Sequence, residues 1–167
     1  MSDINKYTLI TQDLEIGFPK PPGKPNISLM KGISVTAKKG ELIAMIGQNG
    51  IGKSTLLRTL VQLQPALSGN VILNNINIEK YTRRELARQV GFVSTEIINA
   101  GNLNVYDLVA LGRFPYTNWF GTINKEDQFM IDHSIELVDL VHKRDKMLTE
   151  ISDGERQRAM IARTLSQ

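Results

Sequence analysis

The sequence predicts an α/β protein with a mixed sheet, an antiparallel β part and an α-helical subdomain, and three observations carry that prediction. The run ELIAMIG at 41–47 is almost wholly apolar, as in a strand buried on both faces of a sheet. A glycine-rich loop follows, and a leucine stripe then begins at helical spacing. Between about 104 and 150 the apolar residues again recur at helical spacing. A sheet covered by helices buries such a pattern.

Short strands and turns alternate at the amino terminus. The runs YTLIT at 7–11 and GISVTA at 32–37 are typical of strands, with β-branched and aromatic residues between turn residues. Between them, PKPPGKPN at 19–26 predicts a loop, because proline cannot donate to a sheet ladder. This part is expected to be β-rich.

Helices and strands then alternate along the chain. We expect a helix from Lys53, ended by Pro65, then a strand at 70–75, a helix from about Thr82 and a buried strand at 90–94. Two further helices are predicted at 104–112 and 125–141. The expected apolar stripes contain Leu56, Leu57, Leu60 and Val61 in the first helix, Leu86, Ala87 and Val90 in the second, and Phe129, Ile135, Leu137, Val138 and Val141 in the last.

Composition excludes several classes of protein. With 167 residues, 41% of them hydrophobic, the chain can bury the core of one domain. It has no cysteine for a disulfide or thiolate metal site, and its two histidines give no zinc pattern. No signal peptide or membrane-spanning run is evident, so a cytoplasmic protein is expected. The net charge of +3 is dispersed, and no nucleic-acid partner is expected.

The loop GQNGIGKST at 47–55 matches the phosphate-loop pattern G-x-x-x-x-G-K-[ST] in full. Glycines let backbone amides turn inward, and the start of the following helix adds positive charge, so the loop is suited to phosphate oxygens. Lys53 would reach the β- and γ-phosphates of a nucleotide, and the Ser54 hydroxyl would hold Mg²⁺. The alternative is a strand-to-helix turn without a ligand.

The last segment, ISDGERQRAMIARTLSQ at 151–167, supports two interpretations. Ser152 and Glu155 form the S-x-x-E capping box of a helix whose apolar stripe contains Ala159, Met160, Ala162 and Leu165. Alternatively, the Ser152 hydroxyl and the Gly154 amide face a second phosphate site. Both interpretations can hold together.

Together, the phosphate loop and ISDGERQRAMIARTL resemble the ATP-binding subunits of ABC transporters, whose signature is usually Leu-Ser-Gly-Gly-Gln. More narrowly, NVYDLVALGRFPYTNWFG and GERQRAMIARTLSQ resemble the importers of iron chelates (siderophores, ferric citrate, haem) and vitamin B12. The resemblance implies a P-loop NTPase fold over 1–167 as a single domain. Its expected parts are a β-rich phosphate-loop core at 1–94, a helical subdomain at 95–150 and the signature segment at 151–167.

The same resemblance implies the site residues. Phe18 takes the place of the aromatic that stacks on adenine. Ser152, Gly154 and Glu155 would face the γ-phosphate held by the opposite subunit, so that a head-to-tail homodimer encloses two ATP molecules with Mg²⁺. Contacts with the chain's own ATP are implied for Gly47, Asn49, Gly50, Ile51, Gly52, Lys53, Ser54 and Thr55.

Three departures from the family pattern stand out. Thr95 and Glu96 occupy the place of a glutamine that senses magnesium and the attacking water, and either could substitute for it. Asp153 replaces the first signature glycine, so we expect its carboxylate to turn away from phosphate, capping its own helix. The family's strand ending in Asp-Glu and its later histidine have no counterpart here. We therefore expect an amino-terminal fragment that binds ATP weakly and does not hydrolyse it.

The implied partners follow from the family. Aromatics gather in RFPYTNWF at 113–120, and residues of about 95–120 are the expected contact with a membrane permease, which would hold the protein on the inner face of the membrane. A substrate-binding protein would be an indirect partner. The complete protein would be an ATP hydrolase that powers an importer. The alternatives are an ABC-type ATPase of DNA repair or translation, and a small-molecule kinase, which leaves the signature unexplained.

Overall fold

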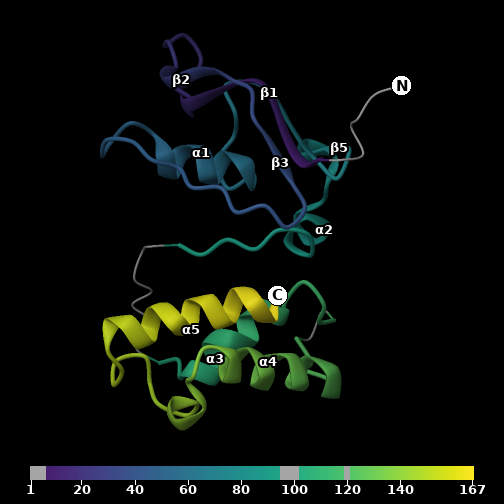
Figure 1. Cartoon of the computed structure of the whole chain (residues 1–167), viewed down its shortest axis with the longest axis vertical. Helices are drawn as coiled ribbons and strands as arrows, with labels where there is room; N and C mark the ends of the chain where they lie inside the picture. The colour runs from purple at the N-terminus through teal and green to yellow at the C-terminus, as the bar shows by residue number, and fades with distance from the viewer. Residues whose placement is uncertain (1–6, 95–101, 119–120) are drawn as a thin grey trace. The chain divides into compact units, whose positions relative to one another are not determined.

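The computed structural model describes residues 7–94, 102–118 and 121–167, and the chain forms two compact units (Figure 1). Met1–Leu86 form the first, called the sheet unit here, and Ala87–Gln167 form the second, called the helical unit. The predicted site residues Thr95 and Glu96 lie outside the described residues.

An antiparallel sheet organises the sheet unit. Its strands run in the order β2-β1-β4-β5, with β3 also paired to β1, and every pair is antiparallel. The turn between β4 and β5 consists of Asn74 and Asn75, both at positive φ, as a tight hairpin requires. The strands are β1 (Tyr7–Phe18), β2 (Ile27–Ile33), β3 (Thr36–Lys38), β4 (Ser68–Leu73) and β5 (Ile76–Asn77). The predicted antiparallel part is confirmed.

Short helices complete the sheet unit. The predicted helix from Lys53 is present as α1 (Lys53–Leu60), and a short α2 (Arg83–Ala87) follows the sheet after the 3-10 turn η2 (Ile78–Lys80). Leu56 of α1 is buried, whereas Leu57, predicted on the same stripe, is 45% exposed. The buried apolar residues of this unit are Leu14, Ile16, Leu56, Val71, Leu73, Ile78 and Leu86.

Two predicted strands are not formed. Residues 41–47 carry no strand, and Leu42 and Ile46 are 97% and 94% exposed. Residues 90–94 also carry none. A strand that is buried on both faces needs neighbours that pair its backbone groups. No described strand pairs with either segment, so the apolar composition alone does not produce a strand.

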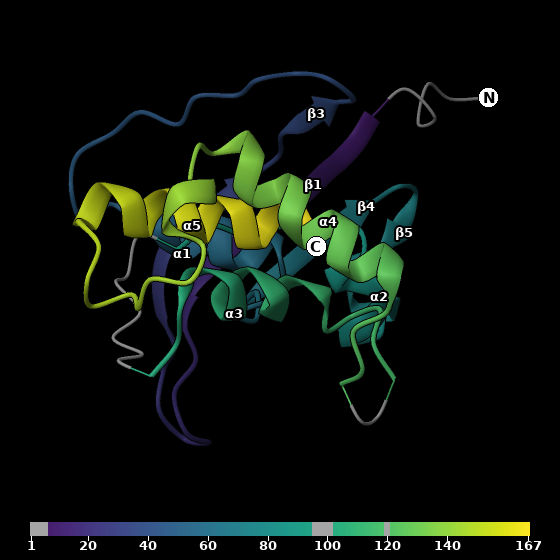
Figure 2. The ribbon, with the colours of Figure 1, turned by 90° about the horizontal axis from the view of Figure 1, so that it is seen from below.

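Helices build the helical unit, and Figures 1 and 2 show α5 lying along α3 and α4. Asn104 and Asn124 cap α3 and α4 in capping boxes with Asp107 and Asp127, which is why these helices start where they do. The elements are α3 (Val105–Ala110), η3 (Leu111–Arg113), α4 (Lys125–Leu137), η4 (Val141–Lys143) and α5 (Asp153–Ser166). Their core consists of Val105, Leu108, Val109, Ile131, Ile135, Leu140, Leu148, Ile151, Ala159, Met160 and Ala162.

The stripe predicted for α4 is partly wrong. Ile131 and Ile135 are buried, but Phe129 and Leu137 are 65% and 61% exposed. Two positions along a helix rotate a side chain by roughly 200°, so Phe129 and Leu137 lie on the opposite face from the buried isoleucines. Val141 in η4 and Leu165 in α5 are likewise exposed. Within the described part of the chain, no helix has the length and apolar character needed to cross a membrane.

Candidate nucleotide-binding site

The glycine-rich loop turns directly into α1. Gly50 and Gly52 have φ of 82° and 108°, and glycine adopts this region without the steric cost that a Cβ brings. Gly52 precedes the helix, and its carbonyl accepts the first helical bond from the Leu56 amide at 2.8 Å. The amides of Lys53, Ser54 and Thr55 come before that bond, so they have no acceptor within the helix.

Lys53 folds back over the loop. Its Nζ donates to the carbonyl oxygens of Gly47 and Gln48, both at 2.7 Å. No side chain caps the start of α1, and the first turn has no acidic residue. An anion site requires positive charge and free donors, and this loop has both. They come from the ammonium group, the amides of the first turn and the positive end of the helix dipole.

The remaining loop residues have the exposure that a ligand site requires. Asn49, Ile51 and Ser54 are exposed, and Thr55 is half-buried. In the described part of the chain, no three Asp, Glu or His side chains gather to hold a metal ion.

Phe18 ends β1 and is 47% exposed. The preceding Gly17 packs so closely against β2 that an added Cβ would lie 2.0 Å from the Ile27 carbonyl oxygen. Two residues before Phe18, the Ile16 side chain lies beside the phosphate loop, 3.6 Å from where a Cβ on Gly52 would be. The strand that carries Phe18 therefore contacts the end of the loop.

In the helical unit, the predicted capping box at the start of α5 is confirmed. Ser152 Oγ accepts from the Glu155 amide at 3.3 Å, while the Ser152 amide donates to Glu155 Oε2 at 2.8 Å. The Ser152 hydroxyl also donates to that carboxylate oxygen, at 2.9 Å. These bonds from Ser152, the amide first, hold the pKa of the Glu155 carboxyl below its ordinary value. Ser152 itself is exposed.

Asp153 points into solvent and pairs with its own helix. Its carboxylate lies 3.3 Å from Arg156 Nη1, and its side chain is 79% exposed. The expectation that Asp153 caps the helix is wrong, because Ser152 is the cap. Arg156 also donates to the carbonyl oxygens of Leu148 and Ile151, at 3.2 and 3.3 Å, and so fixes the turn before Ser152. Sequence reasoning missed Arg156, although its i, i+3 spacing from Asp153 indicated the pair.

Gly154 has a helical backbone and open space around it. A Cβ built there would meet no described atom within 4 Å, and the residue is exposed. Glycine inside a helix destabilises it by about 0.5–1 kcal/mol relative to alanine. Neither packing nor backbone geometry in the described residues accounts for a glycine at this position.

Comparison with known sequences identifies the family. A sequence model of the ABC transporter family matches residues 30–167. The chain belongs to this family. An uncharacterized ABC transporter ATP-binding protein of Methanocaldococcus jannaschii is 38% identical over 159 residues, which cover 95% of this chain and 53% of that protein. The ferric enterobactin transport ATP-binding protein FepC of Escherichia coli is 34% identical over 156 residues, covering 93% and 55%.

Solved structures show the same fold. The cbiO1 subunit of Clostridium perfringens, part of an ABC transporter complex, matches with a TM-score of 0.74 and 25% identity, over 96% of this chain and 62% of that one. A dimeric bacterial ABC transporter cassette matches with a TM-score of 0.78 and 23% identity, over 95% and 69%. The predicted P-loop NTPase fold of ABC type is thus confirmed. The chain spans about half the length of the curated relatives it matches.

Proposed function

We propose that this chain provides the ATP-binding loop and the signature segment of an ATPase subunit that powers an importer of iron chelates, haem or cobalamin. The observation that carries the proposal is the loop geometry, in which Lys53 Nζ lies across the carbonyls of Gly47 and Gln48 at the uncapped start of α1. The name of one relative, for ferric enterobactin transport, supports the iron-chelate branch.

Binding of ATP would change the partners of Lys53. The ammonium group would exchange two neutral carbonyl acceptors for anionic phosphate oxygens, which adds charge–charge attraction to the hydrogen bonds. The amides that lead into α1 would donate to the same phosphates. Ser54 would supply one oxygen ligand to Mg²⁺, which neutralises phosphate charge, and the exposed ring of Phe18 would stack on the adenine.

The signature segment would serve a second subunit. Exposed Ser152 and the bare surface at Gly154 would face the γ-phosphate of the opposite copy in a head-to-tail dimer. The Asp153–Arg156 pair supports this role, because it partly neutralises a carboxylate that would otherwise repel phosphate. Glu155 would keep Ser152 in place through the capping box.

The permease contact is proposed at about 95–120. Within the described part of this range, Phe114 is 60% exposed and Tyr116 is 38% exposed, so two aromatic side chains are available to a partner. Such a contact would hold the protein at the inner face of the membrane, with a substrate-binding protein as an indirect partner.

ATP hydrolysis is assigned to the whole protein. No observation favours the alternative role in DNA repair or translation.

Calorimetric titration of the protein with Mg²⁺-ATP tests the binding proposal. Lys53→Ala should weaken ATP affinity by about tenfold or more, because a charge-assisted contact of roughly 1.5–3 kcal/mol is lost. Lys80→Ala, which changes an exposed lysine of the same unit, is the matched control and should leave the affinity unchanged. Equal affinities for the Lys53 variant and the unaltered protein would refute the site.

Co-purification with the permease tests the transport role. Phe114→Ala should reduce recovery of the complex, whereas Phe129→Ala, at a similarly exposed aromatic on α4, should not. Unchanged recovery of the Phe114 variant would contradict the proposed contact.

A further inference from the structure

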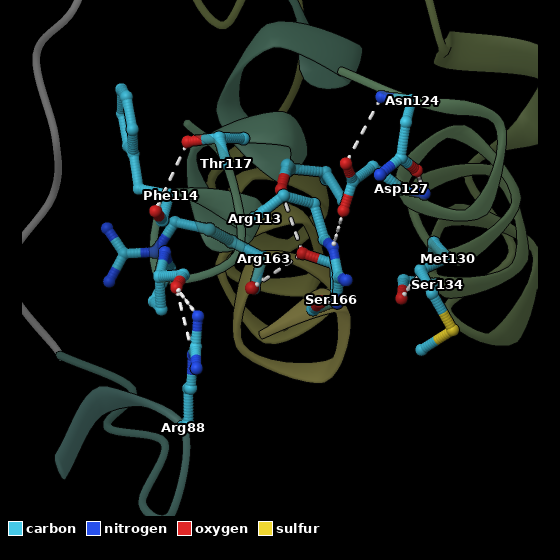
Figure 3. A network of polar contacts seen from close by, with 12 residues as sticks. Arg88, Arg113, Phe114, Thr117, Asn124, Asp127, Met130, Ser134, Arg163 and Ser166 are labelled. Carbon is cyan, nitrogen blue, oxygen red and sulfur yellow. Dashed lines mark hydrogen bonds and ion pairs between the residues drawn. The ribbon is translucent and has the colours of Figure 1, made fainter. Parts of the chain in front are cut away.

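A buried charge network joins the turn after α3 to the carboxyl end of α5 (Figure 3). Arg113 has a side chain that is 7% exposed, and its Nε lies 2.9 Å from Oδ1 of Asp127, which is 2% exposed. Its Nη1 donates to the Ser166 carbonyl oxygen at 2.6 Å. One guanidinium group therefore binds both the start of α4 and the end of α5.

The backbone next to Arg113 packs closely against α5. A Cβ on Gly112 would lie 2.1 Å from the Arg163 carbonyl oxygen, so the turn after α3 packs directly on the backbone of α5. Ser166 Oγ donates to the Val109 carbonyl at 2.8 Å, which adds a second bond between α3 and α5. Movement of one element without the other would break these bonds.

The network extends from Arg113 to the proposed permease surface. The Arg113 guanidinium lies over the Tyr116 ring, 4.0 Å from its centroid, and Arg88 lies 5.1 Å from the same centroid. Arg88 also donates twice to the Pro115 carbonyl, at 2.9 and 2.7 Å. Two arginines therefore hold the turn that exposes Phe114.

At its other end, α5 begins at Ser152. The helix covers Asp153–Ser166, roughly 21 Å at 1.5 Å per residue, and its middle is buried through Ala159, Met160 and Ala162. A helix held along its length by a packed core moves as one piece. A displacement applied near Ser166 would thus reach Ser152.

We propose that Arg113 is a positioning residue that joins the permease-facing turn 113–117 to the signature helix, so that force on the turn reaches Ser152. This inference rests on the proposed function. Apolar side chains would fill the same space at less desolvation cost, so packing alone does not explain a buried Arg–Asp pair. The planar fork of arginine sets direction as well as distance to both partners, which lysine cannot do.

Arg113 lies within the proposed permease range, but its side chain is buried, so its effect should appear only in the coupling between nucleotide and permease. The full-length protein is reconstituted with its permease in lipid vesicles, and ATP turnover is measured with and without permease. Arg113→Lys and Asp127→Asn keep the side-chain sizes close. The matched control is Arg144→Lys, because Arg144 also pairs with an aspartate, Asp132, at 3.2 Å and lies over a tyrosine, Tyr106, at 4.1 Å.

We expect the kcat of permease-stimulated turnover to fall about tenfold in the Arg113 and Asp127 variants, within the usual range of coupling between sites. KM for ATP and permease-free turnover should stay unchanged, as should all values for Arg144→Lys. An equal fall with and without permease, or no fall in either variant, would overturn the inference while leaving the proposed function standing. Unaltered protein without any permease stimulation would overturn the proposed function, and the inference with it.

Discussion

Glu155 accepts hydrogen bonds from both the backbone amide and the hydroxyl of Ser152, at 2.8 and 2.9 Å. The carboxylate is also 3.7 Å from Lys143 Nζ. Each of these contacts favours the ionised acid, so the pKa of Glu155 is lowered, chiefly by the bond from the Ser152 amide. The geometry of the signature serine therefore depends on the charge of a neighbouring acid.

The first prediction concerns pH. Because the folded protein lowers the pKa of Glu155 below its ordinary value of 4.5, the carboxylate stabilises the fold above about pH 4.5 and loses this effect as the pH falls through the lowered value. Glu155→Gln should therefore lower the unfolding temperature near neutral pH. The difference from the unaltered protein should disappear in acid. A difference that persists unchanged down to the acid limit of the fold would contradict this.

The second prediction separates stability from function at Gly154. Because a Cβ there meets open space, Gly154→Ala should raise the free energy of unfolding by about 0.5–1 kcal/mol. In the proposed dimer the same methyl group would crowd the γ-phosphate, and overpacking of roughly 1–3 kcal/mol should weaken ATP-dependent dimer formation by about tenfold or more. Denaturant unfolding and light scattering with ATP measure the two effects.

The matched control for this variant is Gln157→Ala, which changes an exposed residue two positions after Glu155 on α5. It should leave ATP-dependent dimer formation unchanged. If Gly154→Ala dimerises as well as the control, the bare surface at Gly154 does not face a ligand.

How far the sequence predicts the structure depends on the range of the interaction. The structure has the glycine turn before Lys53, the helix that starts there, and the capping box of Ser152 and Glu155. Each of these features follows from residues within a few positions of one another. The apolar run 41–47 is different. Its predicted burial depended on strands elsewhere in the chain, and the described residues provide none beside it.

The Arg113–Asp127 pair shows a second limit. The two residues are 14 positions apart in different elements, and Asp127 also forms a capping box with Asn124, which explains it locally. Arginine side chains usually lie at the protein surface, so residue type alone predicts an exposed side chain. Only the packing of α4 and α5 shows that both charges are buried.

The third prediction measures that pair. Asp127→Ala should cost about 3–5 kcal/mol of unfolding free energy, because the Arg113 charge stays buried without its partner. The double variant Asp127→Ala with Arg113→Met also removes the unpaired buried charge. It should therefore be more stable than Asp127→Ala alone. Denaturant unfolding of the single and double variants gives the coupling energy. Additive losses would show that the two side chains act independently.

The fourth prediction tests whether the loop conformation is required for binding. Gly52 has φ of 108°, and a side chain there costs about 1–3 kcal/mol in backbone strain, although its neighbours Leu29 and Ile16 lie at ordinary contact distance from an added Cβ. Gly52→Ala should therefore lower the unfolding free energy by that amount. It should also weaken ATP binding, because relief of the strain turns the amides before α1 away from the phosphates. Unfolding without nucleotide and calorimetric titration with Mg²⁺-ATP measure the two effects.

Gly47→Ala is the control for that strain. Gly47 is not among the glycines of positive φ, and an added Cβ would lie 3.4 Å from the nearest atom, a methyl carbon of Ile51. Its unfolding free energy should stay within about 0.5 kcal/mol of that of the unaltered protein, as for a substitution without strain or cavity. A Gly52 variant as stable as this control, with unchanged ATP affinity, would mean that the loop tolerates another backbone path and that the left-handed turn at Gly52 is not what places Lys53 for phosphate.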